Sequence, residues 1–433
     1  TYTVTVRDEA GETDTRDVTI TLTGTPDPAP RLYFAANGDN GERGLYSYDP
    51  ATNTLTTHAT GLILDDLRSA DATPMAVLGG NLHFIADDLT GAGYRLMTLG
   101  LGDDSVTRRA ALPTGFDPYP PDSDPGFSGN NLSAFGRNGV FNSWTAASGP
   151  ELKAYNVAGN SVGTIAAPAA GGVLWRGEIW YSTMSDFGPA ELRSYNPDTL
   201  ADTRRASIRI PLVGFESIVD FHPLPQYRVL FDLTPVGDRL FFTRFGDTNP
   251  PEFPDMHSVQ LGAYNAATGQ FEDYARPLQQ DPYLPELSQL TELNGQLWLV
   301  LNDVVSNFRG LSIFDPANKA FGETLMPNNA LPSWLTAIEG KLWMSAAVDP
   351  AKGEEPVIFD PRTGTFTVID VNLGAASSNP SDFTLLAGKV FFAASGRTLS
   401  DQRSDRELWV YDLATGTLDE VEIAPGSGGE ILN

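Results

Sequence analysis

The stretch Pro380–Ile423, PSDFTLLAGKVFFAASGRTLSDQRSDRELWVYDLATGTLDEVEI, decides how the rest of the chain is interpreted. It contains four segments in which β-branched or aromatic residues alternate with others, which is the pattern of short strands. Glycines in two of the three connections suit tight turns. We name the four predicted strands a, b, c and d, and expect them at Asp382–Leu386, Lys389–Ala394, Glu407–Asp412 and Thr417–Ile423.

The signatures of strands b and c recur eight times along the chain, and successive strand c signatures lie 40 to 69 residues apart. A four-stranded sheet of this kind cannot bury both faces alone, so the copies must stack and close into a ring. The sequence therefore predicts an all-β fold, an eight-bladed β-propeller of four-stranded antiparallel blades, with seven blades as the alternative. The second residue of strand b is a ring in every copy: Tyr33, His83, Phe141, Trp180, Phe241, Trp298, Trp343 and Phe391.

We interpret these rings as packing between blades, since a position that recurs in every blade serves the architecture. His83 is then a core residue and not a ligand. Blade 1 begins directly with a strand b at Arg31–Ala35 and lacks a strand a before it. We expect Glu430–Asn433, at the other end of the chain, to supply the missing strand and to close the ring.

Composition limits the class of protein. The 433 residues are 41% hydrophobic, enough for a large core, and they carry 28 basic and 55 acidic residues for a net charge of −27. Nucleic acid is excluded as a partner because phosphate binding needs clustered Lys and Arg. The sequence contains no apolar run of 18 residues, so it predicts no membrane-spanning segment. The absence of cysteine excludes disulfides and thiolate metal sites, and the acidic balance fits an exported protein.

Two stretches carry a family resemblance. The segment RELWVYDLATGT, with Glu407-Leu408-Trp409, resembles the bacterial surface-protein repeat named for Glu-Leu-Trp-x-x-Asp-Gly-Thr, although Tyr411-Asp412-Leu413 departs from Asp-Gly-Thr. Residues 1–26 resemble the final hairpin of the cadherin-like (VCBS-type) repeats of large bacterial adhesins. The resemblance implies an extracellular, cell-surface protein, a monomer whose partners are adjacent adhesin domains and a glycan or peptide on a host or neighbouring cell.

This resemblance divides the chain into a C-terminal hairpin of a sandwich module at residues 1–24, a linker at 25–30 and the propeller at 31–433. The hairpin is the stub of a preceding domain or an added edge strand. Cadherin-like modules hold interdomain calcium, which implies Asp8, Asp17 and Asp27 as calcium ligands; acidic turn residues that are only solvated are the alternative. A proline-stiffened loop with Asp117, Asp122 and Asp124 is a second calcium candidate.

Long inserts interrupt the middle of the chain at Leu112–Asn131, Pro211–Arg228, Arg244–Gln260 and Pro277–Leu287. By their place in the repeat, all four emerge on one face of the propeller, whereas the opposite face has short turns only. Loops of this length in a compact domain are usually functional or disordered, and these are rich in rings. We predict ligand contacts at Tyr119, Phe127, Phe253 and Tyr283; packing of the rings against the propeller is the alternative.

A further set of positions follows from counting back eight residues from the residue directly before each strand b ring, such as Val390 before Phe391. These positions should lie at the top of strand a and face the central channel. Asp232, Trp334 and Asp382 are added from this set to the predicted ligand-binding residues. The full set is Pro74, Leu132, Gly171, Asp232, Gln289, Trp334 and Asp382.

Motifs for catalysis are missing from the sequence: it has no Gly-x-Ser-x-Gly elbow, no phosphate loop and no pair of histidines at metal-ligand spacing. The functional prediction is thus a non-catalytic adhesion module that binds glycan or peptide on its long-loop face, with calcium as its cofactor. A propeller glycosidase or lyase and a structural spacer are the alternatives.

Overall fold

The structure is a computed structural model. No helix that could cross a membrane occurs in the parts of the chain it describes. It describes residues 2–7, 13–18, 30–37, 43–62, 75–87, 89–91, 93–112, 116–117, 132–135, 138–145, 149–183, 189–208, 230–246, 258–274, 285–303, 308–322, 325–326, 330, 332–397, 404–421, 423 and 430–431.

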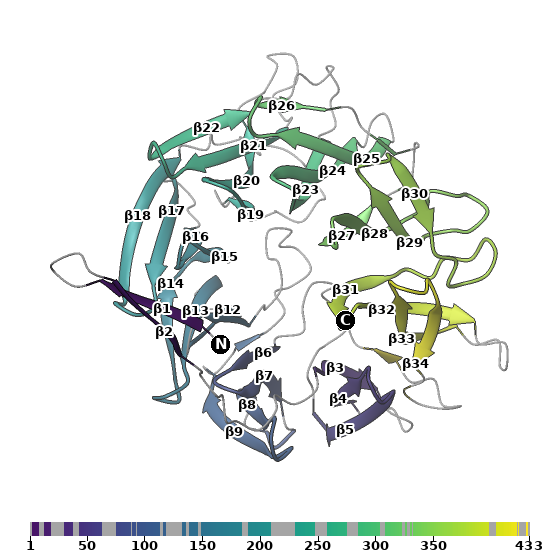
Figure 1. Cartoon of the computed structure of the whole chain (residues 1–433), viewed down its shortest axis with the longest axis horizontal. Coiled ribbons are helices and arrows are strands. Elements are labelled where there is room, and N and C mark those ends of the chain that lie inside the picture. The colour runs from purple at the N-terminus through teal and green to yellow at the C-terminus, as the bar shows by residue number, and fades with distance from the viewer. Residues whose placement is uncertain are drawn as a thin grey trace, which may run out of the picture.

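Eight antiparallel sheets are arranged in a ring, which confirms the eight-bladed propeller and excludes the seven-bladed alternative (Figure 1). In blades 2 to 8 the strands follow one another from the inner edge outward, in the order a to d. The bounds of blades 1 to 4 are as follows. Blade 1 has β35 (Glu430–Ile431), β3 (Leu32–Asn37), β4 (Arg43–Asp49) and β5 (Thr54–Thr60); blade 2 has β6 (Met75–Leu78), β7 (Asn81–Asp87), β8 (Tyr94–Gly100) and β9 (Val106–Ala111); blade 3 has β10 (Phe116–Asp117), β11 (Ser133–Phe135), β12 (Asn138–Thr145), β13 (Gly149–Asn156) and β14 (Ser161–Ala166); blade 4 has β15 (Ala169–Trp175), β16 (Glu178–Thr183), β17 (Ala190–Asn196) and β18 (Ala201–Ile208).

The second half of the ring repeats this order. In blade 3, β10 and β11 both pair with β12 and share the inner position. Blade 5 has β19 (Phe231–Val236), β20 (Arg239–Gly246), β21 (Ser258–Asn265) and β22 (Gln270–Tyr274); blade 6 has β23 (Pro285–Leu293), β24 (Gln296–Asp303), β25 (Phe308–Asp315) and β26 (Ala320–Phe321); blade 7 has β27 (Ser333–Ile338), β28 (Lys341–Ala346), β29 (Glu355–Asp360) and β30 (Thr365–Val368); blade 8 has β31 (Ser381–Leu386), β32 (Lys389–Arg397), β33 (Ser404–Asp412) and β34 (Leu418–Val421).

The two ends of the propeller meet in blade 1, as predicted. Ile431 pairs with Ala36 and Glu430 pairs with Asn37, so β35 is the inner strand of a sheet whose other strands come from the start of the propeller. Blades 8 and 1 also share a hydrophobic cluster, in which the Phe391 and Tyr48 rings meet edge to face at 5.8 Å. The seam is therefore closed by strand pairing and by packing together.

A separate hairpin precedes the propeller. It consists of β1 (Tyr2–Arg7) and β2 (Thr13–Val18), which pair antiparallel from Tyr2 with Val18 to Arg7 with Thr13. The structure has a hairpin in this region, with its second strand in the polar segment Thr13–Val18. Ile20 and Leu22, which alternate with Val18 in the sequence, lie outside the described residues.

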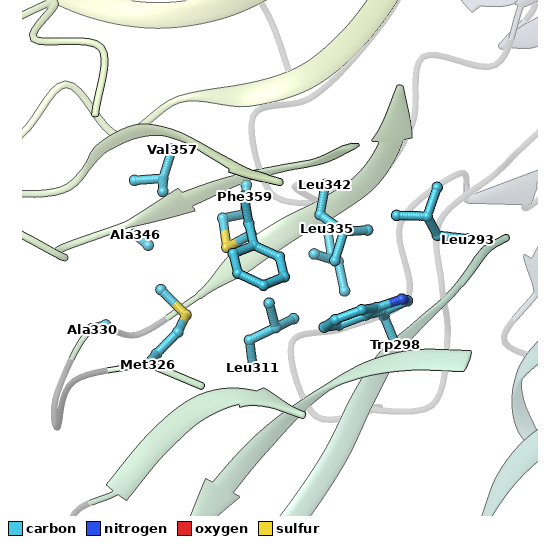
Figure 2. Packing of buried hydrophobic residues seen from close by; sticks show 11 residues of the cluster. Leu293, Trp298, Leu311, Met326, Ala330, Leu335, Leu342, Ala346, Val357 and Phe359 are labelled. Carbon is cyan, nitrogen blue, oxygen red and sulfur yellow. The ribbon is translucent and has the colours of Figure 1, made fainter. Parts of the chain in front are cut away.

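Large side chains from neighbouring blades fill the spaces between the sheets. Between blades 6 and 7, the Trp298 indole meets the Phe359 ring at 5.5 Å, and Leu311 and Leu342 lie in the same cluster (Figure 2). Trp298 is 2% exposed. Burying a large apolar side chain fully contributes about 1.5–3 kcal/mol, so the eight interfaces between blades dominate the stability of the ring.

The ring residue of strand b packs between blades in every copy, as expected. In seven blades it lies against the following blade, whereas Phe141 lies in the cluster with Ile85 and Leu96 of the preceding blade. The reason is a one-residue offset: Gly139, not Val140, pairs with Tyr155, and a shift of one residue moves each side chain to the other face. His83 is buried against the Tyr155 ring, which confirms its place in the core.

The aspartate or asparagine after the last ring of strand c holds the c–d turn. Asp412 Oδ1 accepts hydrogen bonds from the N–H groups of Ala414 and Thr415, at 2.9 and 3.0 Å. Such bonds lower the pKa of the Asp412 carboxyl below its ordinary value. The signature is therefore a repeated turn cap. The same cap occurs at Asp49, Asn156, Asn196, Asn265, Asp315 and Asp360.

The Glu-Leu-Trp stretch in strand c is structural. The Glu407 carboxylate accepts the N–H of Ile423 at 3.2 Å, Leu408 packs at the seam, and Trp409 Nε1 donates to the Ala394 carbonyl at 3.1 Å. In blade 7 the matching glutamate, Glu355, accepts the N–H of Val371 at 3.0 Å. A buried glutamate at the start of strand c thus anchors the chain that leaves strand d.

Candidate functional site at the inner edge of the ring

The innermost strands of five consecutive blades contain the same β-bulge. In blade 5, Phe231 pairs with Thr243 and Thr234 with Phe241, so two residues, Asp232 and Leu233, lie opposite one. The first bulge residue has a left-handed backbone, with φ of 53° at Asp232. The equivalent φ angles are 74° at Gly171, 54° at Gln289, 56° at Trp334 and 59° at Asp382.

These five residues are members of the set that was predicted by counting back from strand b. Four of them are not glycine, although a β-carbon in the left-handed region costs roughly 1–2 kcal/mol. Strained backbone of this kind concentrates at functional sites, so an observed outlier supports a hypothesis of function. The left-handed backbone at non-glycine residues, and not the repetition, makes the bulge a candidate for a site in the described residues.

A hydroxyl two residues after the bulge links neighbouring blades. Thr234 Oγ1 donates to the carbonyl of Asp232 at 3.0 Å and to the carbonyl of Leu290 in blade 6 at 3.1 Å. Thr291 Oγ1 likewise donates to the Leu335 carbonyl of blade 7 at 3.0 Å. The bulge-Leu/Phe-Thr pattern recurs at Asp232-Leu233-Thr234, Gln289-Leu290-Thr291, Trp334-Leu335-Thr336 and Asp382-Phe383-Thr384, and the sequence analysis missed it.

The inner strands form a wall around the centre of the ring (Figure 1). Each inner strand is the strand of its blade that lies nearest the centre, so its exposed side chains are accessible from there. At the bulge, Asp232 and Asp382 are exposed and Trp334 is half-buried. Trp334 packs partly against the cluster that contains Phe383, the residue after Asp382, so the indole and that carboxylate come from adjacent parts of the wall.

The other end of the inner strands lies near the a–b turns. The residue six positions before the strand b ring is apolar and exposed in three blades that are not neighbours: Val77, Leu174 and Leu385, with 52%, 52% and 39% of the residue exposed. Single exposed apolar side chains of this kind are normal on a protein surface. The same position holds Pro235, Glu292 and Ala337 in blades 5 to 7, and Ala134 in blade 3 once its one-residue offset is included.

The remaining predicted site residues divide into two groups. Asp17 lies in β2 and Asp117 in β10, and the structure describes their backbone alone. The others lie outside the described residues, and their predicted roles stay predictions. They are the ligand-binding candidates Tyr119, Phe127, Phe253 and Tyr283 and the calcium candidates Asp8, Asp27, Asp122 and Asp124.

One expectation near the long inserts is wrong. Leu132 is 4% exposed and lies in the core between blades 2 and 3, so it does not face the channel. The offset in blade 3 explains this, because the count from strand b began one residue too late. Phe116, a ring of the first insert, is buried in the same core, against Phe141 at 6.3 Å, which is the packing alternative for this one ring.

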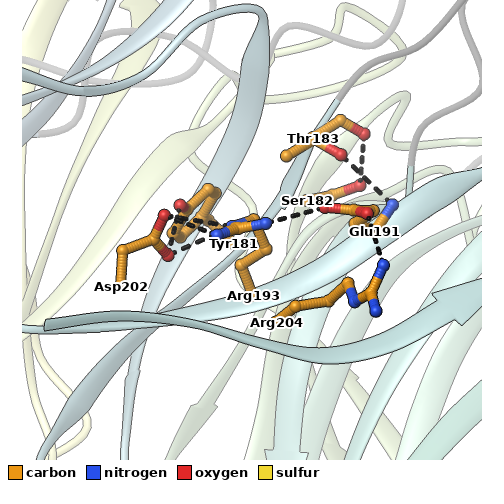
Figure 3. Close-up of polar contacts among 7 residues, drawn as sticks. All are labelled: Tyr181, Ser182, Thr183, Glu191, Arg193, Asp202 and Arg204. Atoms are coloured by element: carbon orange, nitrogen blue, oxygen red, sulfur yellow. Dashed lines mark hydrogen bonds and ion pairs between the residues drawn. The ribbon is translucent and has the colours of Figure 1, made fainter.

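A polar network lies in blade 4, away from the inner edge (Figure 3). Asp202 accepts hydrogen bonds from the Tyr181 hydroxyl and from Arg193, at 2.9 and 2.8 Å, and Arg193 also contacts Glu191 at 2.7 Å. Burial, and then Asp202, raises the pKa of Tyr181 above its usual range, so the hydroxyl stays protonated. Arg204 reaches Glu191 at 3.4 Å. With its charges paired, the network ties strands b, c and d together.

Neither a metal centre nor a catalytic centre is apparent in the described part of the chain. No group of three or more His, Cys, Asp or Glu side chains there is placed to hold a metal ion. A propeller domain on its own can be non-catalytic, with the chemistry residing elsewhere in the protein.

Comparison with known proteins adds information at the level of the fold. No protein-family model matches the sequence. No curated protein matches it either. Among solved structures, a puromycin hydrolase mutant in complex with PGG superposes with a TM-score of 0.51 at 15% identity, and the match covers 82% of this chain and 54% of that one. A structure from work on two prolyl endopeptidases is a second match, with a TM-score of 0.52 at 12% identity. The match covers 82% of this chain and 49% of that one. This chain thus spans about half the length of these proteins.

These matches correct the functional prediction. The structures matched above are those of a puromycin hydrolase and of prolyl endopeptidases, and this finding contradicts the prediction of a non-catalytic adhesion module. The resemblance to surface-protein and cadherin-like repeats, the extracellular location and the calcium ligands of the hairpin remain predictions.

Proposed function

We propose that this chain is the propeller domain of a peptidase-type protein, that the propeller itself is non-catalytic, and that it holds a peptide at the inner edge of the ring. The proposal takes the class of protein from the propellers of puromycin hydrolase and prolyl endopeptidase, which have this fold. The single observation that supports a peptide site is the half-buried Trp334 indole, held in a left-handed backbone beside the Asp382 position of the next blade.

The chemistry of the wall suits a peptide. A flat aromatic surface binds side chains at a low cost in entropy, and carboxylates accept hydrogen bonds from backbone N–H groups or pair with cationic groups. At the neighbouring bulge, Asp382 Oδ2 accepts a hydrogen bond from Ser381 Oγ at 2.5 Å, and Arg406 donates to the same hydroxyl at 2.6 Å.

Charge favours a basic peptide. The net charge of −27 attracts cations to the protein and raises their rate of encounter. An arginine or lysine side chain placed over the Trp334 face would make a cation–π contact. We therefore expect basic peptides to bind more tightly than acidic peptides of the same length, with a preference that weakens as salt is added.

The test is fluorescence anisotropy with labelled octapeptides, one series basic and one acidic, on the whole chain. Trp334→Gly relieves the left-handed backbone and removes the indole, so we expect folding to be kept and binding of the basic series to weaken about tenfold, as for interface anchors. Arg362→Ala, in a c–d turn far from the inner edge, is the matched control and should bind normally. Equal binding by both variants would overturn the peptide site.

The non-catalytic role has its own measurement. Fluorogenic peptides incubated with the isolated chain should remain intact over a day. Cleavage activity that copurifies with the chain, and that is abolished by substituting one residue in the described part of the structure, would overturn this part of the proposal.

A further inference from the structure

The connection between blades 7 and 8, residues 369–380, wraps around a buried carboxylate. Glu355 is fully buried, and its Oε2 accepts the N–H of Val371 at 3.0 Å and the hydroxyl of Ser378 at 2.6 Å. Its Oε1 accepts the N–H of Asn372 at 3.4 Å. This one side chain therefore holds both ends of the connection over the start of β29.

Glu355 differs from the equivalent glutamates of two other blades in the charge of its partners. In blade 3, Glu151 pairs with Lys153 at 2.5 Å, and in blade 4, Glu191 pairs with Arg193 at 2.7 Å. In the described part of the chain, no basic side chain pairs with Glu355, and its hydrogen bonds come from neutral groups. An ionised carboxylate that is buried without a cation is costly, so a proton is the counter-charge that remains for Glu355.

The charged groups on the blade 7 side leave this cost in place. Asp370, in the connection, is a like charge that disfavours the ionised form of Glu355. Lys352 Nζ lies 3.6 Å from Asp370 Oδ2 and is paired with that carboxylate. Glu354 accepts the Ser345 hydroxyl at 2.6 Å.

The charged groups of blade 8 that approach the connection also engage other partners. Arg406 donates to the Asn379 carbonyl at 2.7 Å and to Ser381 Oγ at 2.6 Å. Asp382 accepts a hydrogen bond from the same serine. Glu407 accepts the N–H of Ile423 at 3.2 Å. These contacts fasten the far end of the connection and supply no cation to Glu355.

Both protonation states of Glu355 have hydrogen-bond partners in the closed connection. The ionised carboxylate accepts the Ser378 hydroxyl. The protonated carboxyl can donate to Ser378 Oγ over the same 2.6 Å, while the serine hydrogen turns to the Glu354 carbonyl at 3.4 Å. Burial raises the pKa of Glu355 to about 7, against the opposing effect of its hydrogen bonds, and Asp370 adds to the rise.

We propose that Glu355 is a pH-sensitive latch: the protonated carboxyl keeps the connection between blades 7 and 8 closed, and loss of the proton loosens it. In the open connection the carboxylate reaches water and returns to its ordinary pKa of 4.5. The closed form then binds more protons than the open form between pH 4.5 and about 7. The preference for the closed form is complete below pH 4.5 and is lost as the pH rises through about 7.

The latch acts beside the inner wall. Ile369 and Val371, at the start of the connection, lie in the hydrophobic cluster against which Trp334 also packs. Opening of the connection withdraws these two side chains from the cluster. The packing beneath the indole therefore depends on the proton of Glu355.

Hydrogen exchange of the whole chain, with mass spectrometry of the segment 369–380, measures this opening. The wild type is compared at each pH with Glu355→Gln, which is neutral throughout, so the intrinsic effect of pH on exchange cancels. We expect the ratio of the two exchange rates to rise about tenfold or more between pH 5.5 and pH 8. Glu339→Gln, at an exposed position in the a–b turn of the same blade, removes the same charge and should follow the wild type.

A measurement on the wild type alone protects the test against a misfolded variant. Protection of the segment 369–380 should fall about tenfold more than protection of β24 over the same pH range. A constant ratio between wild type and Glu355→Gln would overturn the proposal, because the connection would then open without regard to this proton. An equal fall in both segments would also overturn it, since the whole fold would be losing stability. Loss of the effect in Glu339→Gln would assign it to net charge and not to Glu355.

Discussion

Gln289 Oε1 accepts a hydrogen bond from the backbone N–H of Leu335 at 2.9 Å, so a side chain on the inner strand of blade 6 holds the inner strand of blade 7. Gln289 does this from a left-handed backbone, with φ of 54°. This hydrogen bond offsets the free-energy cost of a left-handed backbone at the first bulge residue, the position that all five bulges share.

The two contributions can be separated by substitution. Gln289→Ala loses the hydrogen bond and keeps a β-carbon in the left-handed region, whereas Gln289→Gly loses the bond and relieves the strain. We expect the alanine variant to be less stable than the glycine variant by about 1 kcal/mol. Urea unfolding of both proteins measures the difference. Equal midpoints would show that the bulge at Gln289 is not strained.

His83 should make the protein sensitive to mild acid. Burial lowers the pKa of His83 below its ordinary value of about 6.5, and Arg109 lowers it further. The unfolded chain therefore binds a proton at a higher pH than the folded chain. The stability that neutral His83 contributes is present above pH 6.5 and is lost as the pH falls below it.

His83→Phe places in blade 2 the residue that Phe241 and Phe391 supply in other blades. When the pH is lowered from 7.5 to 5.5, we expect the free energy of unfolding to fall less in this variant than in the wild type. Urea unfolding at several pH values gives the two slopes. Parallel slopes would mean that burial does not lower the pKa of His83 in the folded state.

Gly396 allows the indole of Trp409 to lie against the sheet of blade 8. A β-carbon at Gly396 would overlap that indole. Overpacking typically costs 1–3 kcal/mol, so Gly396→Ala should be destabilised by about that amount. Gly163 in β14 has no atom within 4 Å of a β-carbon and is the matched control. Thermal unfolding should rank Gly163→Ala at or above the wild type, and the reverse order of the two variants would refute the packing argument.

Removing residues 430–433 should lower the melting temperature. The deletion takes away β35, exposes the edge of β3 in blade 1 and leaves its backbone groups without partners. Deletion of residues 432–433 alone keeps both paired residues and serves as the control. Identical melting of the two truncated proteins would show that the packing at the seam closes the ring without β35.

The architecture was predictable because the sequence repeat corresponds to one blade. Strand b and strand c signatures that recur eight times identified eight blades, and the missing strand of blade 1 identified Glu430–Asn433 as the closing segment. The offset in blade 3 was not predictable, since Val140-Phe141 matches the pattern at the wrong register and only the pairing of Gly139 with Tyr155 reveals it.

The candidate site was predictable in part. Counting positions located Asp232, Trp334 and Asp382, but it could not show that their backbones are left-handed, because no glycine marks the bulge in these three blades. The hydrogen bonds around Glu355 could not be predicted at all. They depend on how the connection between blades 7 and 8 folds over Glu355, a contact between strand c and the chain after strand d.

The pairing of β35 with β3 has a consequence for biosynthesis. Blade 1 is the first blade to leave the ribosome and the last to be completed, because its inner strand follows all the other blades in the sequence. Until then β3 has an open edge, and the pairing that closes it spans nearly the whole propeller. Contacts so distant in sequence form slowly and prolong the exposure of unpaired strands to aggregation. Newly made copies are therefore most vulnerable at blade 1, which makes this blade the place where a chaperone would be needed longest.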